Sequence, residues 1–204
     1  MEVSSLMIEK PITVSDRTSV QEAIYLMEEN GIRHLPVVNQ SQKLVGWVTL
    51  GDMKQGLLPA VVTGLSLADL MIKDPITVHP DADIETAARL IFEKKIGGMP
   101  VVDGNDKVVG VITVTDILGA FIKIMGILSN GLIIDVDVGE REDGFENVSR
   151  IIRDNGGQIV SVGIAPDSPS ANGRTIHHFR LKKCPEQPIV KALKEGGYNV
   201  FSSS

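Results

Sequence analysis

The sequence contains little cysteine, few aromatic residues and no clustered positive charge. Its one cysteine, Cys184, excludes an internal disulfide and is typical of a reducing compartment. Aromatic residues make up only 4% of the 204 positions, so a core must be built from aliphatic side chains and methionine. Acidic side chains outnumber basic ones by 26 to 20, which argues against a polymeric nucleic acid as partner, because phosphate contacts need clustered lysine and arginine.

Long hydrophobic runs, targeting segments and catalytic signatures are also missing. The longest apolar stretch, residues 117–128, is twelve residues long, whereas a membrane span needs about 20, so we expect a core or interface helix there. Residues 1–5 lack the basic start of a signal peptide. No nucleophile elbow, phosphate-binding loop or zinc signature is present, and the adjacent His177 and His178 would point to opposite faces of a strand. We therefore expect a cytoplasmic protein without catalytic residues, metal or membrane contact.

The most informative feature that the sequence does contain is an internal duplication. Met7–Val14 aligns with Met71–Val78, and Gly46–Asp52 aligns with Gly110–Asp116, both at an offset of 64 residues. Between residues 7 and 53, 18 of 47 positions are identical to the residue 64 places later, without a gap. Self-similarity of this kind predicts two copies of one structural unit.

Each copy predicts a short strand, a helix, two strands and a second helix. In the first copy we expect Thr18 to cap the helix with Gln21 completing a capping box, and Gly31 to end it in the left-handed conformation. Apolar residues recur at helical spacing in both copies: Val20, Ala23, Ile24 and Met27, then Ile84, Ala87, Ala88 and Ile91. In the first copy the later elements are two strands around a polar turn and a helix, near 35–38, 44–49 and Asp52.

This pattern resembles the CBS domain, present as the tandem pair called a Bateman module, over residues 4–125. The motifs are a Pro-x-Thr-Val opening, a Pro-Val-Val strand and Gly-hydrophobic-hydrophobic-Thr-x-x-Asp, each present twice in register. The resemblance implies an α+β fold in which two units of βαββα type, residues 1–62 and 63–126, pack around a pseudo-twofold axis. It also implies that the cleft between the copies binds an adenosine-containing ligand: AMP, ADP, ATP or S-adenosylmethionine.

Two Thr-x-x-Asp pairs have chemistry that suits a ribose: Thr49 with Asp52, and Thr113 with Asp116. An ionised aspartate accepts from both ribose hydroxyls, and the threonine offers a hydroxyl and a backbone amide. Each aspartate is alternatively a helix N-cap. The second copy adds a hydroxyl at Thr115, so we expect it to form the stronger site.

The two copies differ where the resemblance places phosphate. Gly51 supplies no hydroxyl in the first copy, but Arg33 and His34 stand there as supplementary phosphate contacts. The second copy has Gly97 and Gly98 instead, which permit close backbone approach. The alternatives are a solvated surface charge for Arg33 and a partly buried polar residue without ligand for His34.

The resemblance assigns the adenine pockets to the opening strands and to the prolines of the later strands. The residues concerned are Thr13, Val14, Pro36, Thr77, Val78 and Pro100. For each valine, plain strand packing by a β-branched residue is an equal alternative. The prolines most simply end or edge a strand.

Residues 127–204 do not continue the repeat and predict a different fold. Their pattern favours strands and helices in the order βαββαβ, a ferredoxin-like plan, over 132–138, 144–155, 158–164, 175–181, 187–195 and 199–201. The two helices present the apolar faces Phe145, Val148, Ile151, Ile152 and Ile189, Val190, Leu193. Gly156-Gly157 and Gly196-Gly197 are expected to end them.

This third segment is similar to an ACT domain, with Asp137–Ser161 carrying the resemblance. Such domains often bind amino acids at the first strand-to-helix turn, but here the turn 139–144 is strongly charged and lacks the usual Pro-Gly, so pairing between protomers is the preferred role. Residues 166–173 are expected to form a hairpin loop. The order CBS–CBS–ACT is similar to the AcuB-like acetoin-utilisation proteins.

Three hypotheses about function follow. The leading one is a non-enzymatic regulatory sensor, a homodimer through its CBS and ACT surfaces, that changes conformation on binding an adenosine ligand and acts on a target protein the sequence does not identify. The alternatives are a structural oligomerisation subunit with degenerate ligand sites and a nucleotide hydrolase. The last lacks an evident base–nucleophile pair.

Overall fold

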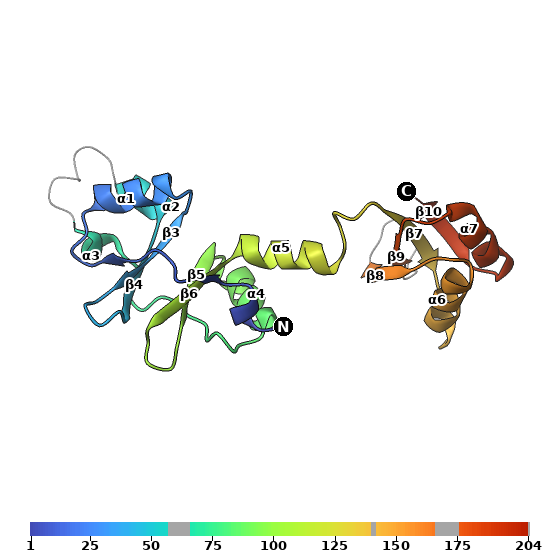
Figure 1. Ribbon diagram of the computed structural model, residues 1–204, viewed down its shortest axis with the longest axis horizontal. Helices are drawn as coiled ribbons and strands as arrows, with labels where there is room; N and C mark the ends of the chain where they lie inside the picture. The colour runs from blue at the N-terminus through green and yellow to red at the C-terminus, as the bar shows by residue number, and fades with distance from the viewer. Residues whose placement is uncertain (57–65, 140–141, 166–175, 204) are drawn as a thin grey trace. The chain divides into compact units, whose positions relative to one another are not determined.

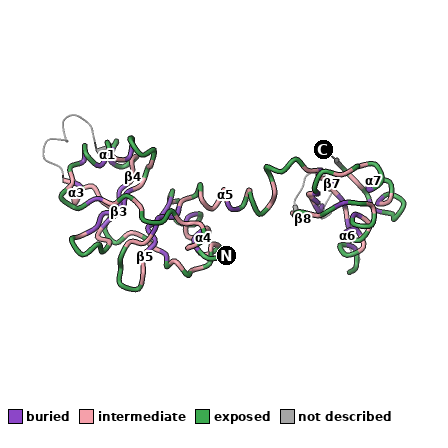
Figure 2. The backbone as a smooth tube through the Cα atoms, viewed as in Figure 1, coloured by how far each residue is buried: buried purple, intermediate pink, exposed green. Residues whose placement is uncertain are grey.

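The computed structural model describes residues 1–56, 66–139, 142–165 and 176–203 (Figure 1). They form two compact units, Met1–Gly119 and Ala120–Ser204. Buried residues lie mostly on the strands and on one side of each helix (Figure 2). Among the described helices, none has the length and apolar character that crossing a membrane requires. The predicted turn at 140–141 and hairpin loop at 166–173 lie outside the described residues.

The first unit contains both copies of the repeat. The first copy supplies a 3-10 turn at Val3–Ser5, then β1 (Ile8–Glu9), β2 (Val14–Ser15), α1 (Val20–Glu29), β3 (His34–Val38), β4 (Leu44–Thr49) and α2 (Leu50–Gly56). The second supplies α3 (Leu67–Leu70), α4 (Ile84–Lys94), β5 (Gly98–Val102), β6 (Val108–Thr113) and α5 (Val114–Ile124). Helix α5 runs past the limit between the two compact units, which falls after Gly119.

The leading segment of each copy joins the other copy. Strand β1 pairs antiparallel with β6, Ile8 opposite Val111, in the sheet β1-β6-β5. The equivalent residue of the second copy, Ile72, forms an antiparallel bridge with Trp47 in β4. Val3 is fully buried in the hydrophobic cluster of the second copy, which contains Met99, and Leu67 is fully buried in that of the first, which contains Met27. Because of this exchange, both copies contribute walls to each space between them.

Helix α1 begins one residue later than expected. Ser19, not Thr18, is its N-cap, because the Ser19 Oγ accepts a hydrogen bond from the Glu22 N–H at 3.1 Å. The Thr18 hydroxyl instead accepts from the N–H of Ser15. The predicted apolar face is confirmed, since Val20, Ala23, Ile24 and Met27 are all buried. Val20, Ile24 and Met27 each contribute about 1.5–3 kcal/mol when fully buried.

The end of α1 is as predicted and has an unexpected counterpart in α4. Gly31 is left-handed at φ 63°, and the N–H of Ile32 reaches back to the Met27 carbonyl. The equivalent residue after α4 is Lys95, which has a side chain and still adopts φ 54°. An L-residue other than glycine is strained in this conformation, so the second copy closes its helix at an energetic cost.

The second unit has the predicted βαββαβ order. Its elements are β7 (Gly131–Asp137), α6 (Gly144–Asp154), β8 (Ile159–Ala165), β9 (Ile176–Lys182), α7 (Glu186–Glu195) and β10 (Asn199–Ser203). The four strands form one antiparallel sheet in the order β10-β7-β9-β8. Gly156 and Gly197 follow the two helices with positive φ, as expected.

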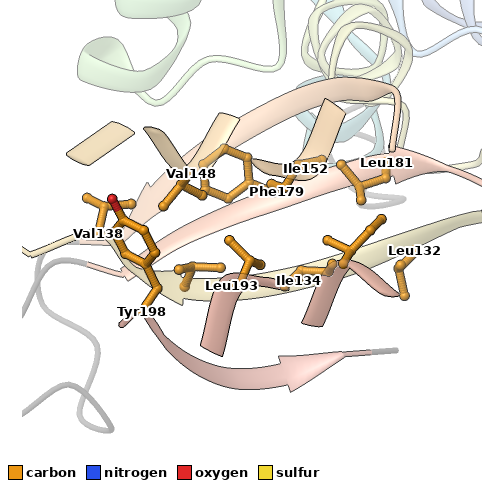
Figure 3. Packing of buried hydrophobic residues seen from close by; sticks show 11 residues of the cluster. Leu132, Ile134, Val138, Val148, Ile152, Phe179, Leu181, Leu193 and Tyr198 are labelled. Carbon is orange, nitrogen blue, oxygen red and sulfur yellow. The ribbon is translucent and has the colours of Figure 1, made fainter. Parts of the chain in front are cut away.

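The core of the second unit lies between the sheet and its two helices. Figure 3 shows Val148 and Ile152 of α6 and Leu193 of α7 close to Ile134 and Phe179 of the sheet. Phe145, which was predicted on the apolar face of α6, is only partly covered, because 47% of its surface is exposed. Its position in the first turn of α6 places its ring at the margin of the core, stacked on Phe179 at 5.8 Å.

Candidate functional site

Two clefts of the first unit are equivalent under the 64-residue offset. The first has a volume of about 410 Å³ and the second about 810 Å³. The first is lined by Ile8, Pro11, Ile12, Ile32, Val111, Thr113, Thr115 and Asp116, among others. At the matching positions the second is lined by Ile72, Pro75, Ile76, Ile96, Trp47, Thr49, Gly51 and Asp52. Each cleft therefore combines the leading segment of one copy with the last strand and helix start of the other.

The Thr-x-x-Asp pairs start helices α5 and α2. In the first cleft, Asp116 Oδ2 accepts from the Thr113 hydroxyl at 2.6 Å and from the Thr113 N–H at 2.8 Å. In return, the N–H of Asp116 reaches the Thr113 hydroxyl oxygen at 3.4 Å. In the second cleft, the Thr49 hydroxyl donates to Asp52 at 2.7 Å, and the Asp52 N–H donates back at 3.2 Å. The bonds between Thr113 and Asp116 form the reciprocal pattern of a capping box, whereas between Thr49 and Asp52 the hydroxyl makes both of the described bonds.

The alternative that the aspartates are N-caps is therefore wrong in detail. The helices begin at Leu50 and Val114, so Thr49 and Thr113 hold the cap position and each aspartate lies in the first turn. Both hydrogen bonds to Asp116 reach Oδ2. Within the described contacts this leaves Oδ1 for a ligand, with the carboxylate held in one orientation at the lining of the first cleft.

Arg33, His34 and Thr115 line both clefts, so the two spaces meet at these residues. The His34 ring stacks on Trp47, with centroids 5.4 Å apart and planes 18° from parallel. Opposite it lies Gly97, where an added Cβ would come within 2.9 Å of His34 Nε2. The glycine that sequence analysis associated with close approach is thus what admits the His34 ring.

The surroundings of His34 favour the neutral form of its ring. Burial lowers the pKa of His34 below its ordinary 6.5, and the positive charge of Arg33 lowers it further, while Asp52 partly opposes this. The ring is therefore neutral near pH 7. The part of His34 as a phosphate contact stays a prediction, and the neighbouring group that carries a positive charge is Arg33.

Sequence analysis proposed fourteen ligand-binding residues, and the structure brings eight of them to the clefts. Arg33, His34, Thr49, Asp52, Gly98, Thr113, Thr115 and Asp116 line one cleft or both. Thr13, Val14, Pro36, Val78 and Pro100 are outside the described lining of either. Val14 and Val78 are buried in the hydrophobic cores, which supports the strand-packing alternative. Thr77 lines a separate polar cleft of about 390 Å³, so the part of these six residues in adenine recognition stays a prediction.

Sequence analysis missed the residues just before the predicted adenine strands. Lys10, Pro11 and Ile12 line the first cleft, and Asp74 and the residues after it line the second. The signal was available, since these positions belong to the duplicated opening motif. What it did not reveal is that each opening segment serves the cleft whose Thr-x-x-Asp pair comes from the other copy.

The described residues contain no group of side chains that could hold a metal ion. No three His, Cys, Asp or Glu side chains gather there in a metal-binding arrangement. His177 is buried beside the Phe145 ring, while His178 Nδ1 lies 2.7 Å from Asp135 Oδ1. The two histidines therefore have different surroundings and do not form a shared site.

Comparison with known proteins identifies the repeat. The family model of the CBS domain matches residues 3–58 and again 67–123. Among curated proteins, a homoserine O-acetyltransferase of Methanohalobium evestigatum is 37% identical over 115 residues, or 56% of this chain. An inosine-5′-monophosphate dehydrogenase of Korarchaeum cryptofilum is 40% identical over 113 residues, or 55% of this chain. The match spans 23% of the length of each of these two relatives.

Solved structures cover the same part of the chain. The CBS domain pair of protein MJ0100, in complex with 5′-methylthioadenosine and S-adenosyl-L-methionine, is 31% identical with a TM-score of 0.56, over 59% of this chain and 95% of that one. CBSX2 in complex with AMP is 30% identical with a TM-score of 0.55, over 60% and 97%. A putative acetoin utilization protein (AcuB) from Vibrio cholerae is also 30% identical with a TM-score of 0.55, over 63% and 95%.

Proposed function

This chain belongs to the CBS domain family, and on that premise we propose that it is a non-catalytic regulatory protein. Its regulatory ligand contains adenosine and is AMP, ADP, ATP or S-adenosylmethionine, bound in the clefts between the two CBS copies. The proposed domains are the two copies, residues 1–62 and 63–126, and an ACT-like domain, residues 127–204.

The observation that carries this proposal is the repeated, oriented Thr-x-x-Asp pair. In both clefts the threonine hydroxyl fixes one oxygen of the aspartate at a helix start. A ribose with two adjacent hydroxyls suits the remaining carboxylate oxygen, through charge-assisted hydrogen bonds. Two similar CBS structures, above 25% identity, were solved with adenosine compounds, which supports the same ligand class here.

Binding in the first cleft would act on the start of α5. Ribose would hold Asp116, and phosphate would lie near Thr115 and the N–H groups of the first helical turn, with Arg33 adding a positive charge. Helix α5 continues past Gly119, so a shift at its first turn also moves residues assigned to the second unit. A ligand regulates through this helix only if it binds the two conformations with different affinity.

Assembly into a homodimer is the proposed way in which this change reaches a target protein. Helix α5 leaves large apolar side chains exposed: Val114 at 44%, Leu118 at 52%, Phe121 at 54% and Ile124 at 61%. Spaced three or four residues apart, they form one helical stripe that favours apolar contact. We place the protein in the cytoplasm, and its similarity to AcuB suggests a target in acetoin utilisation.

Calorimetric titration with AMP, ATP, S-adenosylmethionine and adenosine tests the proposal. Asp116→Ala should weaken binding in the first cleft about tenfold or more, because a hydrogen bond to a charged group is worth about 1.5–3 kcal/mol. Asp52→Ala is the matched variant for the second cleft and should leave the first unchanged. Absence of binding by every adenosine compound, or unchanged binding in both variants, would refute the proposal.

A further inference from the structure

The two clefts differ at the positions that suit phosphate. Where the first cleft has Lys10, Arg33, His34 and Thr115, the equivalent residues of the second are Asp74, Gly97, Gly98 and Gly51. Three hydrogen-bond donors are thus replaced by glycine and one cation by a carboxylate. The aspartate and threonine that suit ribose are retained in both. At these equivalent positions the second cleft has therefore kept the groups for a ribose and lost the side-chain donors for a phosphate, so the donors that remain in its lining are Arg33, His34 and Thr115, which it shares with the first cleft, together with Lys54 and Lys95.

The two clefts share one set of side chains that could donate to a phosphate, and the second cleft has no copy of its own at the equivalent positions. Arg33, His34 and Thr115 line both spaces at the place where these meet. If a phosphate in the first cleft contacts Arg33, a second phosphate in the other cleft would have to share the same donors. Two anions would then lie close together around a single guanidinium, and like charges repel.

The cations of the second cleft do not restore the lost contacts. Lys54 is paired with Glu28 at 2.9 Å. Lys95 also lines this cleft, but it occupies the position of Gly31, which is not one of the donor positions of the first cleft, so it replaces none of the lost side chains. Trp47 stands where the first cleft has Val111, and with the neutral His34 it gives the second cleft an aromatic wall. Such a wall suits the apolar faces of a nucleoside better than an anion.

We infer that the CBS pair holds one phosphate-bearing ligand, in the first cleft, and a phosphate-free adenosine compound in the second. This inference rests on the proposed function, because it presumes that both clefts take adenosine. It adds the ligand class of each cleft, and it names Thr115 and Gly51 as the residues that distinguish them.

Native mass spectrometry counts bound ligands per chain and tests the inference. The wild-type protein should bind one AMP but two adenosines, and one of each when both are present. Two AMP molecules bound with similar affinity would overturn the inference while leaving the proposed function intact. If neither AMP nor adenosine binds, the proposed function fails as well, so the two failures are distinguishable.

An exchange of residues between the clefts gives a second, independent test. At Gly51 an added Cβ would meet the Thr49 hydroxyl oxygen at 3.8 Å, an ordinary contact, so Gly51→Thr fits. It should raise the affinity of the second cleft for AMP about tenfold and leave its affinity for adenosine unchanged. Thr115→Gly should weaken AMP in the first cleft to the same extent. Variants at Gly97 and Gly98 are unsuitable, because their Cβ atoms would lie 2.9 Å from His34 and from the Ile112 carbonyl oxygen.

Counting bound ligands in a third variant tests whether Lys95, a cation of the second cleft, helps to hold a phosphate. Lys95→Gly should not alter the number of AMP molecules bound. A number of bound AMP molecules that differs between this variant and the wild type, or an AMP preference that neither exchange changes, would contradict the inference. Each variant is first compared with the wild type by thermal unfolding, and the count on the wild-type protein decides the main point even if one variant does not fold.

Discussion

The fit of the His34 ring against Gly97 leads to a sharp prediction about Gly97→Ala. The new methyl group would lie 2.9 Å from His34 Nε2, closer than real Cβ contacts, and 3.2 Å from Cε1, tighter than most of them. The His34 ring also stacks on Trp47, which is only 4% exposed, and this contact limits how far the ring can move away. Overpacking of this kind costs about 1–3 kcal/mol. We expect about 1–2 kcal/mol, since the ring is only half-buried.

Thermal unfolding and tryptophan emission measure the two consequences. A loss of 1–2 kcal/mol should lower the Tm by about 5–10 °C for a unit of this size. Trp47 is the one tryptophan of the sequence, so a change in its emission reports directly on the displaced His34 ring. The affinity for adenosine in the second cleft should fall as well, because His34 and Trp47 both line it.

Gly104→Ala is the matched control. A Cβ there meets no atom of the described residues within 4 Å, and its backbone is not among those with positive φ. It should therefore leave the Tm and the emission of Trp47 close to wild type. The reasoning is refuted if Gly97→Ala is as stable as Gly104→Ala and shows the same emission.

Three further predictions concern stability. The pKa of His34 is lowered in the folded state, so the unfolded state binds more protons and stability should fall as the pH drops from about 7 to 5. Urea unfolding at a series of pH values should show this slope reduced in His34→Gln; an unchanged slope would contradict it. Lys95→Gly should stabilise by about 0.5–1 kcal/mol, because relief of the left-handed strain exceeds the entropic cost of glycine. Lys94→Gly, in the last turn of α4, should instead destabilise by about 1 kcal/mol. Val3→Ala should cost about 1.5–3 kcal/mol in chemical denaturation, as for a core position, and a cost below 0.5 kcal/mol would argue against burial in the second copy's core.

Local features of the fold could be predicted from the sequence because they depend on neighbours along the chain. The spacing of Val20, Ala23, Ile24 and Met27 identified the buried face of α1, and Gly31 identified its end. The Gly-Gly pairs identified both helix ends of the second unit. Where neighbouring residues offered the same chemistry, the prediction failed by one position, because Thr18 and Ser19 can both cap a helix, and in the structure Ser19 caps α1 while Thr18 binds the N–H of Ser15.

Long-range features could not be predicted, since the repeat makes two partners equally suitable. Val3 and Leu67 are equivalent apolar residues, and each fits the core of either copy by sequence alone. The composition of the clefts depends on which choice is made, so Lys10 and Ile12 were missed although they lie in the repeated motif. The partial exposure of Phe145 could not be predicted for a related reason. Helical spacing shows which side chains share the apolar face of α6, but not how far along the helix the sheet covers that face.

The exchange of leading segments has a consequence for the asymmetry of the clefts. Two separate copies of one repeat would have to meet by diffusion to complete their cores, and their clefts would then be identical by symmetry. Joined in one chain, each segment finds its core at an effective concentration on the order of millimolar, whatever the amount of protein. The covalent joining also removes the demand for symmetry, because Arg33 and Gly97 are encoded separately. A duplicated chain can therefore give its two clefts different ligands, which a symmetric dimer of single repeats cannot do.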